Sequence, residues 1–218
     1  MRLRFWRGGG RVLYLSGAIS SQIDRYAHPR VGFLLTPYGG NVAPKQRPWA
    51  ADNGCFTRGY PDVDGARWRR FVERVRSGTG CLFVAAPDVV GDWSATLAMW
   101  RNGGETLART FGVPVAIVLQ DGARLETIPW DDIDAVFVGG STAWKLRSAP
   151  FIREAVRRGK HAHVGRVNTW RRIAWARACN ADSVDGTHLA HNVSALLPRL
   201  NSWMARLDQQ LSLKLLGG

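Results

Sequence analysis

Short polar segments, most of them with an aspartate or a glutamine close to glycine, follow six of the apolar runs in this sequence. A single aspartate after a strand usually caps the next helix or shapes a turn. Six such segments in one chain are hard to explain by packing alone, and we interpret them together as a candidate active site. They are ADNGCF (51–56), PDVVGD (87–92), LQDG (119–122), VGGS (138–141), HVGRVNT (163–169) and ADSVDGT (181–187).

The residue types in these segments could exchange a base on a sugar. Cleaving an N-glycosidic bond builds positive charge on the sugar and negative charge on the departing base. One carboxylate can capture the sugar covalently, and a second carboxyl group can move the proton at the base. Amides and backbone groups beside glycine can read the edge of a base in a pocket. The residues that supply this set are Asp185, Asp52, Asp88, Gln120, Gly139 and Gly140.

Apolar runs alternate with helical patterns along the chain, which predicts a parallel sheet. The runs lie at 11–16, 31–36, 49–52, 81–86, 113–119, 134–138, 161–165 and 182–185. Apolar residues recur at helical spacing over 66–76, 94–111, 148–158 and 169–179. Eight strands favour a compact (β/α)8 barrel of the TIM type, whose active sites lie at the carboxyl ends of the strands. A doubly wound open sheet is the alternative.

The whole chain, 1–218, is expected to form a single domain, because its length and 45% hydrophobic content suit one buried core. Glycine, proline and polar residues over 17–30 and 37–48 predict that the first helices are short or replaced by loops. The tail, 189–218, predicts one or two helices that close the barrel. The three cysteines are widely scattered (Cys55, Cys81 and Cys179), so we expect neither a disulfide framework nor a structural zinc site.

Positive charge is the unusual feature of the composition. Thirty Lys and Arg residues against 17 Asp and Glu residues give a net charge of +13 and a sequence pI near 10.9. Such a surplus favours a polyanionic partner such as DNA, and a merely basic surface is the alternative. The sequence shows no signal peptide and no apolar run of spanning length, so we expect a cytoplasmic protein without membrane contact.

Several residues are candidates for contacting a nucleic-acid strand. TIM barrels often bind phosphate near the seventh and eighth loops, where helix N-termini supply N–H donors. Arg166 could therefore hold a phosphate, or it could form a surface ion pair. Aromatic residues in basic segments could stack on bases, as Trp6 and Trp49 would. The strand-contacting set that we select is Arg166, Asn168, Lys145 and Trp144.

Three further aspartates have simpler interpretations. Asp92 precedes Trp93-Ser94 at an expected helix start and is interpreted as a helix cap. Asp121 follows Gln120 directly, and turn chemistry is sufficient to explain it. Asp182 lies three residues before Asp185, which places the two on opposite faces of a strand, and it is interpreted as structural.

The histidines could suggest a metal site. His161 and His163 should share one face of a strand, and His188 and His191 could share one face of a helix. Because no carboxylate or cysteine stands at ligand spacing, we expect no metal. The role of the four residues stays open, with His188 a candidate to line the pocket beside Asp185.

The six segments, in this order, resemble those of the tRNA-guanine transglycosylase superfamily over roughly residues 49–190. The closer likeness is to its short DNA-acting branch, the 7-deazaguanine DNA transglycosylases of phages and bacteria. The resemblance implies that Asp185 is the nucleophile and Asp52 the acid/base residue. It further implies that the base is held by Asp88, Gln120, Gly139 and Gly140, with Asn53 and Cys55 in its pocket.

Two departures from that family bear on the substrate. The tRNA enzymes carry three cysteines and a histidine as a zinc site after the nucleophile, whereas no cysteine follows Asp185 here. A zinc subdomain is therefore not expected, which moves the expected substrate from tRNA to DNA. Asn53 and Cys55 replace Ser and Gly of the family, so base specificity could differ. The implied reaction exchanges guanine in DNA for a free 7-deazaguanine base such as preQ0, without a cofactor.

Two other functions fit the same residues. The pocket could hydrolyse the glycosidic bond and leave an abasic site, or the chain could be a non-catalytic DNA-binding barrel that serves a partner enzyme. Buried carboxylates argue against the second, because a binding surface does not need them. The sequence leaves open which deazaguanine is used, the DNA context and strand preference, the oligomeric state and the need for a protein partner.

Overall fold

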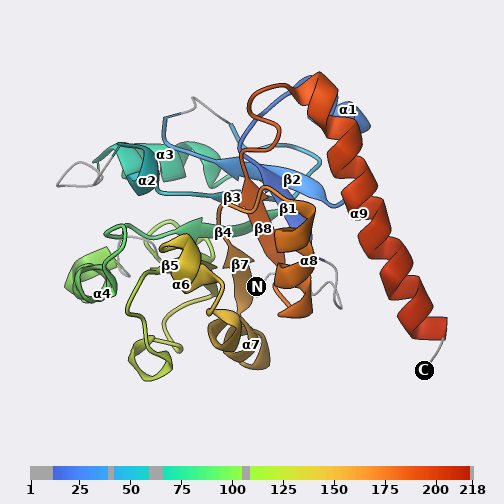
Figure 1. The fold of residues 1–218 in the computed structure, drawn as a ribbon. Coiled ribbons are helices and arrows are strands. Elements are labelled where there is room, and N and C mark those ends of the chain that lie inside the picture. The colour runs from blue at the N-terminus through green and yellow to red at the C-terminus, as the bar shows by residue number, and fades with distance from the viewer. Residues whose placement is uncertain (1–11, 39–41, 59–65, 105–108, 217–218) are drawn as a thin grey trace.

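Eight parallel strands close into a barrel in the order of the sequence (Figure 1). The computed structural model describes residues 12–38, 42–58, 66–104 and 109–216. Strand β1 pairs with both β2 and β8, which completes the closure and makes the open doubly wound sheet wrong. The strands are β1 Leu13–Ser16, β2 Val31–Leu35, β3 Trp49–Ala51, β4 Cys81–Ala85, β5 Val115–Leu119, β6 Ala135–Val138, β7 His161–Val164 and β8 Ser183–Gly186. All eight lie where the apolar runs predict them.

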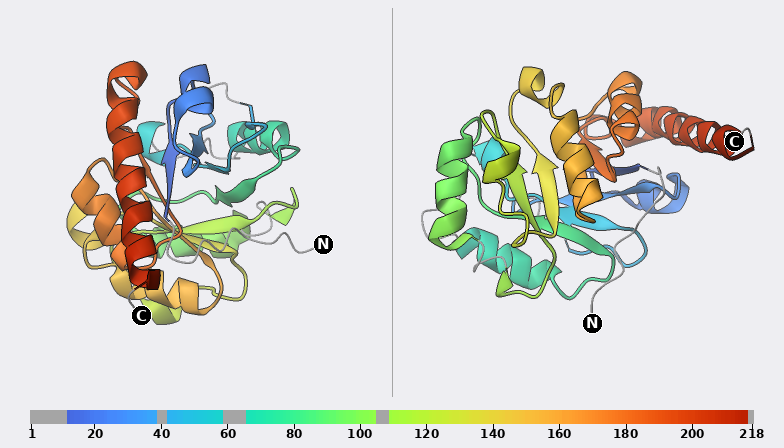
Figure 2. Two further views of the ribbon diagram at one scale, coloured as in Figure 1. Left: turned by 90° about the vertical axis from the view of Figure 1, so that its right-hand side faces the viewer. Right: turned by 90° about the horizontal axis from the view of Figure 1, so that it is seen from below.

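Helices cover the outside of the barrel (Figure 2). The first βα connections are irregular as predicted, with only the six-residue α1 after β1 and no helix in the described residues between β2 and β3. The helical segments are α1 Ser21–Tyr26, α2 Cys55–Arg58, α3 Ala66–Val75, α4 Trp93–Met99, the π-helical turn η1 Trp100–Gly104, the 3-10 turn η2 Leu125–Thr127, α6 Thr142–Lys145, α7 Ala149–Arg157, α8 Trp170–Ala178 and α9 Val193–Leu216.

One predicted helix is shorter than expected. Apolar spacing predicts a helix over 94–111, but α4 ends at Met99 and a π-helical turn follows. Gly103 has a φ of 120° and Asn102 is also non-helical, so the regular hydrogen-bond ladder cannot continue through them. Residues 105–108 lie outside the described part of the chain. At the other end, the Asp92 carboxylate accepts a hydrogen bond from the Ala95 N–H at 2.9 Å, which confirms it as the helix cap.

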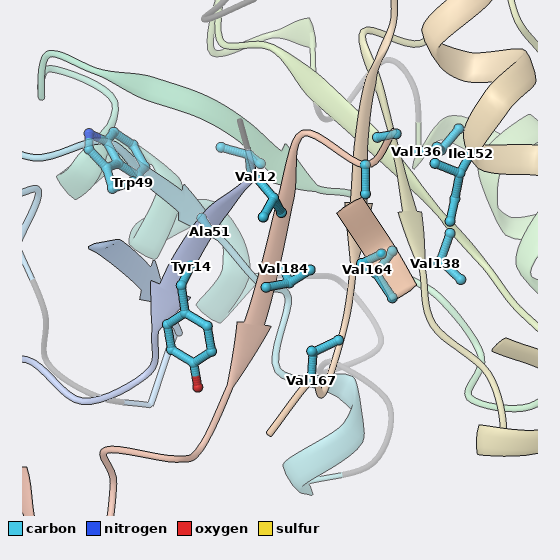
Figure 3. Packing of buried hydrophobic residues seen from close by; sticks show 14 of the residues in the cluster. Val12, Tyr14, Trp49, Ala51, Val136, Val138, Ile152, Val164, Val167 and Val184 are labelled. Atoms are coloured by element: carbon cyan, nitrogen blue, oxygen red, sulfur yellow. The ribbon is translucent and has the colours of Figure 1, made fainter. Parts of the chain in front are cut away.

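The core has two layers. Side chains that alternate along the strands point either into the barrel or out toward the helices. Figure 3 shows part of the outer layer, where Val136 and Val138 of β6 lie near Ile152 of α7. The inner layer consists of Leu13, Leu15, Leu34, Ala50, Leu82, Phe83, Ala85, Ala116, Val118, Ala135 and Phe137. Polar residues from β7 and β8 join this inner layer, a departure from the branched aliphatic residues that usually fill such barrels.

Helix α9 lies along the outside of the barrel beside α1 and α8 (Figure 1 and Figure 2). The Asn201 side chain accepts from the His28 N–H at 2.8 Å, and Asp208 forms an ion pair with the buried Arg30. The Arg206 guanidinium lies 4.5 Å from the centre of the Trp170 ring of α8. The predicted helical tail is thus a single helix that begins at Val193.

Arg47 joins α1 to the start of β2. Its guanidinium donates to four backbone carbonyls, those of Asp24 (2.9 Å), Ala27 (3.0 Å), His28 (3.0 Å) and Val31 (2.8 Å). These carbonyls lie at a helix end and a strand start, where regular backbone hydrogen bonding is interrupted, although that of His28 also accepts from the Val31 N–H. The basic segment before β3 therefore has a structural role at Arg47.

Arg47→Ala is expected to lower the free energy of unfolding by about 2–3 kcal/mol, because several half-buried carbonyls lose a charged donor. Urea unfolding of both proteins measures the difference. Lys45→Ala, at an exposed position two residues earlier, is the matched control and should change the value by less than about 0.5 kcal/mol. Equal effects of the two substitutions would contradict the role given to Arg47.

The interpretation of Trp49 as a base-stacking residue is wrong. Its position after Lys45 and Arg47 in a basic segment suggests stacking, but the side chain is fully buried in β3. Its indole N–H donates to the Thr79 carbonyl at 2.8 Å. A tryptophan with this environment packs the core and cannot stack on a base. Trp6, the other stacking candidate, lies outside the described residues.

Candidate active site

The polar segments meet at the carboxyl end of the barrel, since every strand is parallel and each segment follows its strand. Asp52 and Asn53 follow β3, Asp88 follows β4, and Gln120 follows β5. Gly139 and Gly140 follow β6, and Asp185 is the third residue of β8. The barrel therefore brings these residues to one end, as the sequence predicts.

Asp88 is the centre of a buried hydrogen-bond network. Its two carboxylate oxygens accept from the Asn53 amide at 2.6 Å and from the Gln120 amide at 2.5 Å. The Cys55 thiol also donates to Asp88, and burial together with this carboxylate raises the pKa of the thiol. Burial raises the pKa of Asp88 itself, while the three donors act in the opposite direction. Asn53 and Cys55 thus hold the Asp88 carboxylate in place.

Gln120 joins this network to the loops after β4 and β6. Its side-chain oxygen accepts from the Gly91 and Gly140 N–H groups, each at 2.9 Å. Gly140 has a φ of +67°, and a Cβ there would lie 2.6 Å from the Asp121 carboxylate, so the position suits only glycine. The Gly139 N–H donates to the Leu119 carbonyl at 2.9 Å. Both glycine N–H groups are therefore already used inside the protein, and a base would have to be read by other groups.

Asp52 has the environment of a proton-transfer group. Burial, followed by the negative charges of Asp185 and Asp88, raises its pKa to about 7. The backbone N–H groups of Gly54 and Asn53 oppose the shift. A carboxyl group that titrates near neutral pH can both give and accept a proton in one catalytic cycle.

Asp185 is 8% exposed and points from β8 toward the same end of the barrel. Its Oδ1 atom lies 2.9 Å from His163 Nε2 and accepts from the Arg166 N–H at 3.2 Å. Its charge contributes to the raised pKa of Asp52, which shows that the two carboxyl groups are close enough to interact. A buried carboxylate and a carboxyl group of raised pKa are the pair that double displacement at a sugar requires.

Arg166 spans the mouth of this site. Its backbone φ of 57° is left-handed, a conformation that costs a non-glycine residue about 1–3 kcal/mol and occurs most often at functional positions. Its guanidinium donates to the Gly140 carbonyl and lies 4.2 Å from the centre of the exposed Phe56 ring. In the described part of the chain these contacts are with a carbonyl and a ring, not with a carboxylate, which does not favour the surface ion pair.

The other three nucleic-acid candidates are less accessible than the sequence suggests. Lys145 is only 5% exposed, and its ammonium donates to the Gly165 carbonyl at 2.8 Å. Burial, then the nearby Arg166, lowers the pKa of Lys145 to about 8. Trp144 is half-buried with its ring centre 5.5 Å from that of Phe151, and the half-buried Asn168 donates to Thr187 at 3.3 Å. Their contact with DNA stays a prediction, which the burial of Lys145 does not favour.

The remaining aspartates are structural. Asp182 Oδ2 accepts from the Ala162 N–H at 2.9 Å, which agrees with the structural role predicted for this residue. Asp121 does more than shape its own turn, because it accepts from both the N–H and the hydroxyl of Ser141 at 2.6 Å. It therefore joins the loop after β5 to the loop after β6, which contains Gly139 and Gly140.

The four histidines form two separate groups. His161 and His163 share the inner face of β7 as predicted, and both contact Ser183. His188 lies in a turn instead of a helix, with its ring centre 4.8 Å from that of Trp203, and His191 is exposed. Among the described residues no three His, Cys, Asp or Glu side chains are placed to hold a metal ion.

Sequence reasoning missed two features of this site. It noticed His163 only as a possible metal ligand and did not single out Ser183 or Phe56. A usable signal was present, since positions 161, 163, 183 and 185 share the inner face of neighbouring strands once a barrel is assumed. Phe56 carried no such signal, because its contact with Arg166 depends on how two distant loops meet.

Comparison with known proteins identifies no family for this chain, so its functional interpretation depends on the geometry of the site and on the six polar segments. No protein-family model matches the chain, and no curated protein matches it significantly. The chain is an eight-stranded parallel β/α barrel with interacting carboxyl groups at the carboxyl end of its strands. None of the helices in the described ranges has the length and apolar character needed to cross a bilayer.

Gly165 lets β7 approach Asp185 closely. A Cβ at this position would lie 2.5 Å from the Phe137 ring and 3.3 Å from Asp185 Oδ1. We expect Gly165→Ala to lower the free energy of unfolding by about 1–3 kcal/mol, because the barrel interior must rearrange around the added methyl group. Chemical denaturation measures it. Gly17→Ala is the control, since a Cβ at Gly17 meets nothing within 4 Å, and a penalty of the same size there would contradict this account.

Proposed function

We propose that this protein is a DNA-guanine transglycosylase, which exchanges guanine in DNA for a free 7-deazaguanine base through a covalent link between Asp185 and the sugar. The observation that carries the proposal is the pair Asp185 and Asp52 at one end of the barrel. Asp185 is a buried carboxylate, and its charge helps raise the pKa of Asp52 to about 7. Nucleophile and proton-transfer group need these two different environments.

The proposed reaction has two displacement steps. Asp185 attacks the anomeric carbon as the bond to guanine breaks, and the protonated Asp52 gives its proton to the departing base. The incoming deazaguanine then gives a proton back to Asp52 and attacks the same carbon, which releases Asp185. Stereochemistry at the sugar is retained because two inversions follow each other. No cofactor takes part in either step.

The network around Asp88 supports recognition of a purine edge. Guanine and its deaza analogues present neighbouring N–H donors, which suit a fixed carboxylate. Asn53, Gln120 and Cys55 donate to Asp88, and a carboxylate offers about four acceptor sites, so one remains for a further donor. The arrangement suits a base that donates an N–H group to this remaining site, with Gln120 kept in orientation by Gly91 and Gly140.

DNA as the polymer partner is supported by charge and by the mouth of the site. The net charge of +13 favours a polyanion. Arg166 and Phe56 at the mouth offer a cation and an exposed ring, groups that can contact a phosphate and a base extruded from the helix. The proposal places the protein with DNA in the cytoplasm, which would be the host cytoplasm for a phage protein.

The test is to incubate the purified protein with guanine-containing DNA and preQ0 and to digest the DNA for nucleoside mass spectrometry. A deazaguanine deoxynucleoside is the expected product. Abasic sites formed without added deazaguanine would instead indicate hydrolysis. Tight DNA binding with neither product, for each deazaguanine tried and with single- and double-stranded DNA, would favour the non-catalytic barrel and overturn the proposal.

A further inference from the structure

A continuous line of hydrogen-bonded side chains runs through the barrel interior to Asp185. His161 Nε2 lies 2.8 Å from Ser183 Oγ, and Ser183 Oγ lies 2.7 Å from His163 Nδ1. His163 Nε2 lies 2.9 Å from Asp185 Oδ1. The line alternates between β7 and β8, which pair so that His163 stands opposite Ser183. Val164 and Val184, the outward neighbours on the same strands, pack toward the helices (Figure 3).

These residues are enclosed by apolar groups. His163 and Ser183 are fully buried, and His161 is 4% exposed. The His163 ring centre lies 4.5 Å from that of Phe137 and 5.0 Å from that of Phe83. Burial, and then the neighbouring His163, lower the pKa of His161 to about 3, so that its ring is neutral at physiological pH. A buried polar line of this kind is stable only when each member has a partner.

The hydrogen-bond directions follow from the acceptor at one end. A carboxylate can only accept, so His163 donates its Nε2–H to Asp185. With His163 singly protonated, its Nδ1 accepts the hydrogen of the Ser183 hydroxyl. Ser183 Oγ in turn accepts from His161 Nε2–H. In this arrangement both rings carry their proton on Nε2, which gives a single direction along the line.

Asp185 is held by one of its two oxygens. Both hydrogen bonds that its carboxylate makes in the described part of the chain, from His163 and from the Arg166 N–H, end on Oδ1. We propose that His161, Ser183 and His163 form a positioning relay that holds Oδ1 and presents Oδ2 as the attacking oxygen. The proposal rests on the function proposed above for Asp185 as nucleophile. The three residues are buried, and in this proposal they act through Asp185.

A purely structural role would not require these residue types. Barrel interiors are usually filled by branched aliphatic residues, and replacing both partners of a buried hydrogen bond by apolar groups of similar shape is nearly neutral for stability. Burying two imidazoles and a hydroxyl in this layer costs desolvation free energy, and packing contacts do not offset that cost. A fixed carboxylate rotamer does give an advantage, because a misplacement of about 1 Å can cost about 100-fold in rate.

The experiment compares three relay variants with His191→Phe, a control at an exposed histidine that is no part of the hydrogen-bonded line. We expect His163→Phe to lower kcat about 100-fold with KM for DNA unchanged, and Ser183→Ala to lower kcat about 10-fold. His163→Gln keeps a donor for Asp185 and should recover most of the loss. Thermal unfolding of each variant is followed in parallel. Equal losses in His163→Phe and His163→Gln, tracking the melting temperature, would overturn the relay.

A second readout does not depend on activity. Nitrogen-15 NMR of the histidine-labelled protein at neutral pH should show both His161 and His163 as Nε2–H tautomers, and Asp185→Asn should shift the Nε2–H signal of His163. If the protein shows these signals but no base exchange, the proposed function fails while the hydrogen-bond geometry of the relay stands. A Nδ1–H tautomer at His163, or a signal indifferent to Asp185→Asn, overturns the relay whatever the activity.

Discussion

Asp185→Asn is expected to reduce base exchange by at least about 1,000-fold, because an amide cannot form the covalent bond to the sugar. The substitution keeps the size of the side chain and lets its oxygen accept from His163 and the Arg166 N–H, as Oδ1 does now. The barrel should therefore remain folded, and affinity for DNA should change little. Nucleoside mass spectrometry measures the exchange, and fluorescence anisotropy with labelled DNA measures the affinity.

The nature of the intermediate gives this prediction a second measurement. The wild-type protein, mixed with DNA and denatured rapidly, should carry a fraction of the DNA as a covalent adduct, and Asp185→Asn should carry none. Asp131→Asn is a suitable control, since Asp131 is exposed and precedes β6 at the opposite end of the barrel. Exchange at the normal rate in Asp185→Asn would remove Asp185 from the role of nucleophile.

Asp52→Asn is expected to slow exchange by about 100- to 10,000-fold, the range typical of a lost general acid/base residue. The wild-type protein should also show a characteristic pH dependence. Asp52 must be protonated to give a proton to guanine, and its pKa is about 7, so kcat/KM should fall as the pH rises through 7. In Asp52→Asn this decline should be absent. A pH-rate profile of both proteins is the measurement, and an unchanged decline in Asp52→Asn would contradict the assignment.

The same shift predicts a change in stability. The pKa of Asp52 is raised to about 7 in the folded state from the ordinary value of 3.8, so between these values the folded protein binds more protons than the unfolded chain. The free energy of unfolding should therefore fall as the pH rises through this window, by up to about 1.4 kcal/mol per pH unit. Asp52→Asn lacks this fall and should be more stable than the wild type at pH 8. Denaturation at pH 5 and pH 8 would show it.

A residue that lowers stability while serving chemistry is typical of an active site. An amide in place of Asp52 would avoid the cost of burying a charge. A glycine in place of Arg166 would adopt the left-handed backbone conformation without strain. Both lie at the carboxyl end of the barrel, near Asp185. Their coincidence at one place supports the view that this end of the barrel carries the function.

Local chemistry explains why the elements could be predicted from the sequence. A strand that is buried on both faces reads as a short apolar run, as β5 does over Val115–Leu119, whatever its neighbours are. A cap such as Asp92 satisfies a backbone N–H three residues away, so its signal is complete within the segment. Because parallel strands must place their carboxyl ends together, Asp52, Asp88 and Asp185 could be assigned to one site as soon as the barrel was inferred.

Only the tertiary structure decided which of these residues touch, because contacts between distant segments depend on closure and register. The register of β7 and β8 places Ser183 between two histidines and His163 against Asp185, contacts about 20 residues apart in the chain. The helix after β6 turns Lys145 inward to Gly165, although a lysine in a basic chain predicts a surface position. Sequence patterns report the surroundings that an element needs, whereas a side chain's partner is set by the elements that happen to meet it.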